Sequence, residues 1–246
     1  MDISGTATVA EIYERSAVGT PPLLQSQDLP GPLSLNRLAQ MGMVRKLDEL
    51  CGYPSEYADT LYGRASIIGK IAPYGTCACS ATALWIWLGG DDFPRTIDVL
   101  SRSHFRTIMH GRRIRTFSRR TSDRQIITIA GQKLTTPIRT ACDLALLPIN
   151  EMSPTRVLDT VATLMSRFGI EPEDCLKLLD DLRFLQRAPQ ARALFRRLKQ
   201  ADPGEWRVPV DPDDDEAPNE TAVGPDADGS GRPRLAVPVG ASGGLR

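Results

Sequence analysis

A short, almost wholly apolar helix is predicted from the stretch Cys79-Ser80-Ala81-Thr82-Ala83-Leu84-Trp85-Ile86-Trp87-Leu88-Gly89-Gly90. Ser80 is the expected N-terminal cap, and the paired glycines end the helix after Leu88. A helix that is apolar on nearly all sides must be buried, so we expect other elements to surround it. Core packing is the favoured interpretation of Trp85 and Trp87, ahead of a ligand pocket or a base-stacking platform.

Apolar residues at helical spacing also occur before this stretch. Ser34 is expected to cap a helix through Leu35, Leu38 and Ala39, followed at 43–47 by its last turn or a short strand. A second helix is predicted over 57–71, before Pro73-Tyr74-Gly75. Residues 1–33, which contain few periodic apolar residues, are predicted to be a flexible leader.

Between residues 93 and 135, apolar residues recur at every second position instead of every third or fourth. Alternation around Ile97 and Ile114 and the β-branched run at 126–129 predict strands, with a turn at 130–133. We therefore expect a small central antiparallel sheet of three or four strands.

Helices resume after the strands, and each begins at a proline. Thr136-Pro137 and Ser153-Pro154 have a capping residue before the proline, while Pro172 and Pro189 begin two further helices. Short loops between them predict packed helical hairpins. The fold class is therefore α+β, with an N-terminal helical part at 34–75, an α+β domain at 76–200 and a tail at 201–246.

The net charge of zero, from 30 basic and 30 acidic residues in 246, conceals two unlike parts. Residues 202–246 contain ten acidic and four basic residues, a net charge of −6, so residues 1–201 have a net charge of +6. The acidic tail has almost no aromatic residues and is predicted to be disordered. It could compete with DNA for the arginines of the folded part.

Composition also excludes some classes of protein. No apolar run is long enough to cross a bilayer, and the N-terminal segment does not resemble a secretory signal. We expect a cytoplasmic protein whose five cysteines are reduced thiols.

Basic residues are concentrated on the predicted sheet. Between Arg102 and Arg139 there are ten basic residues and one acidic residue. Such a face suits phosphate binding, but it also suits an acidic protein partner, docking of the acidic tail, or simple solvation. The candidate residues for nucleic-acid or partner binding are Arg102, Arg106, Arg112, Arg113, Arg115, Arg119 and Arg120.

Catalytic and metal sites have little support in the sequence. Cys77, Cys79, His104 and His110 could supply zinc ligands, but buried thiols are the favoured interpretation. Neither histidine lies in a sequence pattern typical of a Ser or Cys catalytic triad, and no cofactor-binding motif is present. We therefore predict no catalytic residue, no metal and no cofactor.

Four segments together resemble a known family. They are the apolar helix from Cys79 to Gly89, the strand residues Ile97-Asp98-Val99 and Arg112-Arg113-Ile114-Arg115, and Leu134-Thr135-Thr136-Pro137-Ile138-Arg139-Thr140-Ala141-Cys142-Asp143-Leu144-Ala145. Over residues 38–200 the chain resembles the AbiEi-like antitoxins of type IV toxin–antitoxin systems. Arg139 and Asp143, one helical turn apart, are expected to form a structural ion pair.

The resemblance implies a degenerate winged-helix DNA-binding part at the N-terminus, with Arg45 and Lys46 at the place of the wing. It also implies an antitoxin domain that acts beside a nucleotidyltransferase-like toxin. Some relatives have a very-short-patch-repair-like endonuclease at the C-terminus, where this chain has its acidic tail. The expected function is a non-enzymatic antitoxin or transcriptional regulator; the alternative is a nuclease-less protein-interaction module.

Overall fold

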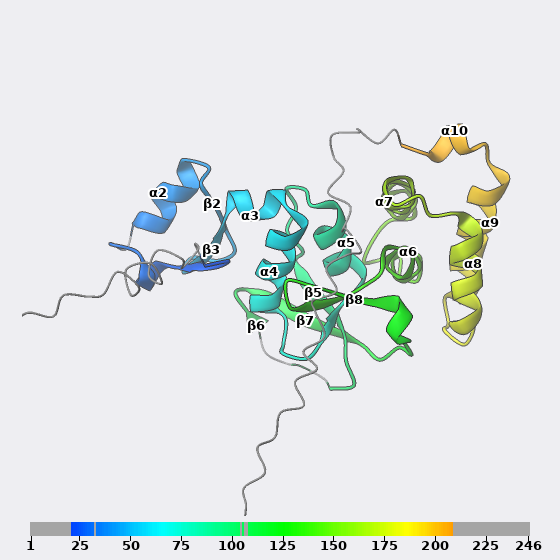
Figure 1. Ribbon diagram of the computed structural model, residues 1–246, viewed down its shortest axis with the longest axis horizontal. Helices are drawn as coiled ribbons and strands as arrows, with labels where there is room; N and C mark the ends of the chain where they lie inside the picture. Colours follow the sequence, from blue (N-terminus) through cyan, green and yellow to red (C-terminus); the bar gives the residue numbers. More distant parts are fainter. Residues whose placement is uncertain (1–20, 32, 104, 106–107, 209–246) are drawn as a thin grey trace, which may run out of the picture. The chain divides into compact units, whose positions relative to one another are not determined.

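The computed structural model describes residues 21–31, 33–103, 105 and 108–208 (Figure 1). Helices and two sheets make up this part of the chain, which confirms the α+β class. Most of the acidic tail and the first part of the leader lie outside the described residues.

The first sheet lies at residues 21–54, together with one helix, and we call this part the helix–sheet module. Its three strands are antiparallel in the order β1-β3-β2. Gly52 in the middle strand is required by close packing, because a Cβ there would lie 2.7 Å from Val44 Cγ1 and 2.8 Å from Arg45 O. The elements are β1 (Leu24–Gln25), η1 (Ser26–Asp28), α2 (Ser34–Gln40), β2 (Val44–Lys46) and β3 (Cys51–Pro54).

Two boundaries in this region differ from the prediction. The end of the expected leader forms β1 and η1, because Leu24 and Gln25 pair with β3. The expected helix over 57–71 is two helices, α3 (Ser55–Asp59) and α4 (Leu61–Ile71), separated at Thr60. The Thr60 hydroxyl accepts a hydrogen bond from Gly63 N at 3.0 Å and so begins α4. Because α4 contacts α5 and strands of the second sheet, it belongs with that sheet and the helices that follow it, which together we call the central domain.

The second sheet has six strands in the order β6-β7-β5-β4-β9-β8. Two of its pairs, β5 with β7 and β4 with β9, are parallel, so the prediction of three or four antiparallel strands was wrong for this sheet. Strands β4 and β6 have two residues each, too few for any alternation to be seen in the sequence. The strands are β4 (Cys77–Ala78), β5 (Thr96–Leu100), β6 (Ile108–Met109), β7 (Arg112–Phe117), β8 (Ile126–Ile129) and β9 (Gln132–Thr135).

The apolar helix α5 (Ser80–Leu88) is buried, as predicted, and contacts α4, α6, β5 and β9. Both of its tryptophans belong to the main core, and Trp87 Nε1 donates to Thr135 O at 2.9 Å. Ser80 does not cap the helix with its side chain; its φ is +49°, and its hydroxyl is buried with no partner among the described residues. The capping groups of α5 come from elsewhere in the fold.

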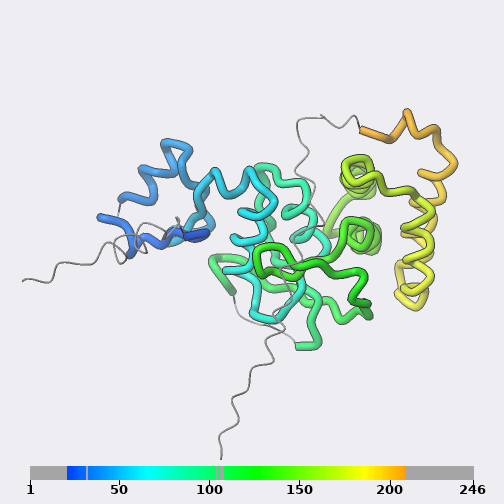
Figure 2. Tube along the Cα trace, viewed as in Figure 1, coloured from blue at the N-terminus to red at the C-terminus, as the bar shows by residue number. Residues whose placement is uncertain are grey.

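The C-terminal helices were predicted well from their caps. Thr136 Oγ1 accepts from Arg139 N, and Ser153 Oγ accepts from Arg156 N, at the start of α6 (Pro137–Ala145) and α7 (Pro154–Arg167). These two helices lie side by side, as do α8 (Pro172–Asp181) and α9 (Ala188–Gln200) (Figure 2). The pairs form the expected helical hairpins.

The described chain continues into the segment predicted to be a disordered tail. The short helix α10 (Pro203–Trp206) packs Trp206 against the core. Arg207 pairs with Glu171, and Val208 N donates to Ser166 Oγ at 2.9 Å. Trp206 and its neighbours therefore belong to the folded part.

Candidate functional site

Asp98 is fully buried at the N-terminus of α5. Its carboxylate accepts from Ala81 N at 3.3 Å, and its own backbone N–H donates to Thr82 Oγ1 at 2.7 Å. A carboxylate at this end of a helix interacts favourably with the helix dipole and with the free N–H groups. Asp98 thus takes the capping role that the sequence assigned to Ser80.

Arg64 occupies the opposite end of α5. Its guanidinium donates to Ile86 O at 2.8 Å and to Trp87 O at 3.4 Å, two of the last carbonyl groups of the helix. A cation at a helix C-terminus is favoured by the dipole. An acid and a base from other elements therefore hold the apolar helix at its two ends.

Arg115, one of the candidate binding residues, pairs with Asp98. The two side chains form a bidentate contact, with Nε to Oδ1 at 2.7 Å and Nη2 to Oδ2 at 2.8 Å, and Arg115 Nη1 lies 2.5 Å from Glu151. Burial raises the pKa of the Asp98 carboxyl, and Arg115 only partly offsets this effect. For Arg115, burial lowers the pKa, but the bonds to Asp98 and Glu151 outweigh it and raise the pKa overall. We call these three residues the Asp98 cluster.

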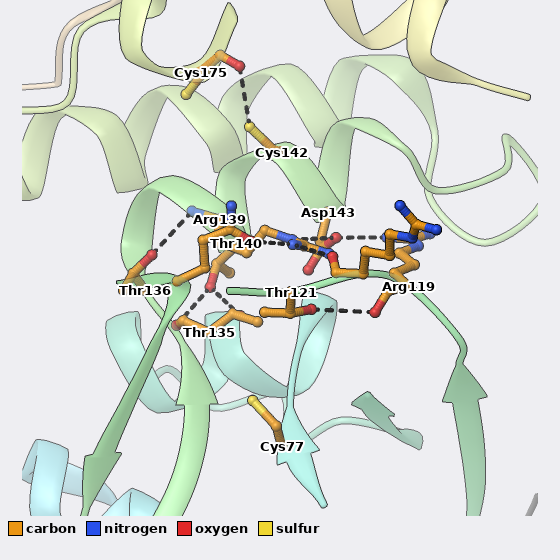
Figure 3. Close-up of polar contacts among 12 residues, drawn as sticks. Cys77, Arg119, Thr121, Thr135, Thr136, Arg139, Thr140, Cys142, Asp143 and Cys175 are labelled. Carbon is orange, nitrogen blue, oxygen red and sulfur yellow. Dashed lines mark hydrogen bonds and ion pairs between the residues drawn. The ribbon is translucent and has the colours of Figure 1, made fainter. Parts of the chain in front are cut away.

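A second buried carboxylate, Asp143 on α6, binds two arginines (Figure 3). Asp143 Oδ1 accepts from Arg119 Nη1 at 2.7 Å and from Arg139 Nε at 3.1 Å. This confirms the predicted pair of Arg139 and Asp143 and adds Arg119 to it. Arg139 is fully buried and also donates to Gln125 Oε1 at 2.6 Å. We call Arg119, Arg139 and Asp143 the Asp143 cluster.

One aromatic ring contacts both clusters. The guanidinium groups of Arg115 and Arg119 lie 5.2 and 4.4 Å from the ring centroid of Phe117. These are cation–π contacts, which strengthen as the groups are removed from water. Arg115 and Arg119 are therefore held by the interior of the fold, and their charges are already compensated there.

The other candidate arginines lie in different surroundings. Arg102, Arg113 and Arg120 are exposed. Arg112 is partly buried over the ring of Phe93, 5.6 Å from its centroid. Arg106 lies outside the described residues. The structure thus divides the predicted basic surface into arginines that pair with buried carboxylates, Arg115 and Arg119, and arginines that do not.

An open groove lies where the helix–sheet module meets the central domain, and we call it the junction groove. Its volume is about 820 Å³. Arg45 and Lys46, which the resemblance placed at a wing, lie on its module side, and Arg112 lies on its central-sheet side. Arg95 also lines the groove. The sequence did not indicate it as a binding residue, because it lies just before a strand with no other basic residue nearby in the chain. Asp91 and Asp92 also line the groove.

The chain matches no protein-family model and no curated protein. Among the described residues, no helix is long and apolar enough to cross a membrane. No group of three or more His, Cys, Asp or Glu residues in that part of the chain could hold a metal ion. Cys77 and Cys79 are buried free thiols, and His104 lies outside the described residues.

Proposed function

We propose that this chain is a non-enzymatic, cytoplasmic DNA-binding regulator, the antitoxin of a type IV system with a nucleotidyltransferase-like toxin as its partner. The observation that supports this proposal best is the topology of the helix–sheet module. Helix α2 lies between β1 and β2 in the chain, and β3 returns to pair between these two strands.

That order of elements is the order found around the recognition helix of winged-helix proteins. In helix-turn-helix proteins the recognition helix enters the major groove and presents its outer residues to the bases. The exposed face of α2 consists of Asn36, Arg37 and Gln40. These three residue types form the commonest hydrogen-bonded contacts with adenine and guanine edges.

The module also fixes one of these side chains. Lys46 Nζ on β2 lies 2.8 Å from Asn36 Oδ1 and 2.9 Å from Glu49 Oε2. Lys46 therefore ties the sheet to the helix face that would contact DNA. Exposed arginines outside the module, Arg102, Arg113 and Arg120, would add phosphate contacts.

Duplex binding tests this proposal. A preferred sequence is first selected from a pool of random 24-bp duplexes, and its affinity for the full chain is then measured by fluorescence anisotropy at increasing KCl concentration. We expect log Kd to rise linearly with log salt, by about 0.9 for each phosphate neutralised. Arg37→Ala should weaken binding to the selected duplex by about 1–3 kcal/mol.

Arg196→Ala is the matched control, since it removes one exposed arginine from α9. Its affinity should stay within about twofold of wild type, because a single distant surface charge is largely screened. Salt-independent binding, or equal losses for the two variants, would contradict the proposal.

The second candidate, a protein-interaction module, is favoured by exposed apolar side chains on the helix–sheet module. Leu33, Met41, Met43 and Leu50 are each more than half exposed. Met is enriched at protein interfaces relative to the rest of the surface, and exposed apolar residues mark an interaction site where they form one patch. The absence of a nucleotidyltransferase gene beside this one would favour this candidate over the antitoxin. If it is right, the chain shows no salt-dependent duplex binding; duplex binding that Met41→Asp and Leu50→Asp leave unchanged would contradict it.

A further inference from the structure

Two arginines with no ion pair among the described residues line the junction groove. Arg95 is the exposed residue just before β5, and Arg112 is the first residue of β7. Strands β5 and β7 are parallel, with Thr96 paired with Arg113, so the two arginines lie at the same end of these strands. Like charges that line one groove repel each other.

Asp91 and Asp92 also line the groove, but in the part of the chain that the structure describes they pair with Arg45 and Arg156 instead. Among the residues that the structure describes, neither Arg95 nor Arg112 forms an ion pair, and the buried Nε of Arg112 has no hydrogen-bond partner. Arg115 and Arg119, further along the same segment, each have a buried carboxylate. The difference points to an anion that is not part of the described chain.

The groove supplies further positive charge opposite these arginines. Arg45 and Lys46 line its module side, although Arg45 is engaged with Asp91 at 3.0 Å and Lys46 with Glu49 at 2.9 Å. Asp92 contacts Arg156 at 3.6 Å. Since Asp91 and Asp92 are both exposed, their ion pairs are weak and can rearrange.

Aromatic packing fixes the groove before any ligand arrives. Tyr53 of the module lies 6.0 Å from Trp85 and 5.5 Å from Phe93, and Trp85 lies 4.7 Å from Phe93. Phe93 in turn supports the guanidinium of Arg112. A site whose walls are held in this way loses little conformational entropy on binding.

We infer that Arg95 and Arg112 form a phosphate-binding site in the junction groove. Each guanidinium group presents a fork of N–H donors, which matches the oxygens of a phosphate in bidentate geometry. A phosphate group also has enough negative charge to compensate two neighbouring cations. The phosphate can belong to the backbone of nucleic acid or to a free phosphorylated ligand.

The nucleic-acid source rests on the proposed function, because it extends the DNA contact from α2 to the central sheet. The site itself does not depend on that function. Pyrophosphate is therefore the probe, and its binding to the full chain is measured by isothermal titration calorimetry in phosphate-free buffer. We expect the double variant Arg95→Gln/Arg112→Gln to raise the Kd for pyrophosphate at least tenfold.

Arg124→Gln is the control, since Arg124 is exposed and lies outside the groove; its Kd should change less than twofold. Asp91→Asn should lower the Kd by a few-fold, because it removes a negative charge from the groove. Arg95→Gln alone keeps the packing of Arg112 and should raise the Kd at least threefold even if the double variant is unstable.

Absence of pyrophosphate binding, or equal binding by wild type and Arg95→Gln, would overturn the phosphate site. Competition by the 24-bp duplex identifies the nucleic-acid backbone as the source of the phosphate, and its absence identifies a free phosphorylated ligand. Pyrophosphate binding without any duplex binding would remove the proposed function and leave the site standing.

Discussion

Strand β7 and the residues just after it supply one arginine to the junction groove and one to each of the Asp98 and Asp143 clusters, yet these arginines have opposite surroundings. Arg115 and Arg119 are bound to carboxylates that are fully buried. Arg112 and the neighbouring Arg95 have no such partner among the described residues. A run of basic residues is thus not one surface, and its members must be separated by what each contacts.

The largest expected effect comes from breaking the Asp143 cluster. Asp143→Ala leaves Arg139, which is fully buried, without its carboxylate. Removing one partner of a buried ion pair typically costs about 3–5 kcal/mol. We expect a loss of this size in the free energy of unfolding, measured by urea denaturation.

Asp123→Ala provides the comparison, because Asp123 is exposed and lies in the same arginine-rich segment. Its free energy of unfolding should stay within about 0.5 kcal/mol of wild type. A small effect of Asp143→Ala would mean that the cluster is more hydrated than its burial indicates.

A smaller loss of stability is expected at alkaline pH, because two buried thiols ionise more readily in the unfolded chain. Burial raises the pKa of Cys77 to about 12, and the charge of Asp143 adds to the rise. Burial likewise raises the pKa of Cys51 to about 11, in the helix–sheet module. The ordinary thiol value is 9.0.

The direction in which stability changes with pH follows from the number of protons that each state binds. Above pH 9 the thiols ionise in the unfolded chain but stay protonated in the folded chain, so the folded chain binds more protons. The stability that the neutral thiols contribute is complete below pH 9 and is lost as pH rises toward 11–12. Urea midpoints should therefore fall between pH 9 and pH 11, and Cys77→Ala should make the fall shallower. An unchanged midpoint over this range would show that the thiols are accessible to water.

Local patterns predicted the elements that depend on nearby residues. The apolar helix α5, the caps at Thr136 and Ser153, and the Arg139–Asp143 pair were all predicted, because each involves residues within a few positions of one another. Buried tryptophans followed from the same pattern. The α+β class followed from the change in apolar spacing.

Contacts between distant parts of the chain were not predictable in this way. Asp98 caps α5 from 17 residues away, and Arg119 reaches Asp143 from 24 residues away. The parallel pairing of β5 with β7 brings the starts of both strands to the same end of the sheet, where Arg95 and Arg112 line the groove. The residues predicted to bind a partner therefore included Arg115 and Arg119, which pair with buried carboxylates, and omitted Arg95.

Urea denaturation tests most directly whether some arginines stabilise the fold through buried carboxylates while others do not. It compares Arg119→Gln with Arg95→Gln at low ionic strength in phosphate-free buffer. Arg119→Gln should lower the free energy of unfolding by about 1.5–3 kcal/mol, because a buried charged hydrogen bond is lost. Arg95→Gln should raise the urea midpoint slightly, because it removes one positive charge from a groove that Arg45, Lys46 and Arg112 also line. Losses of similar size in both variants would contradict this distinction.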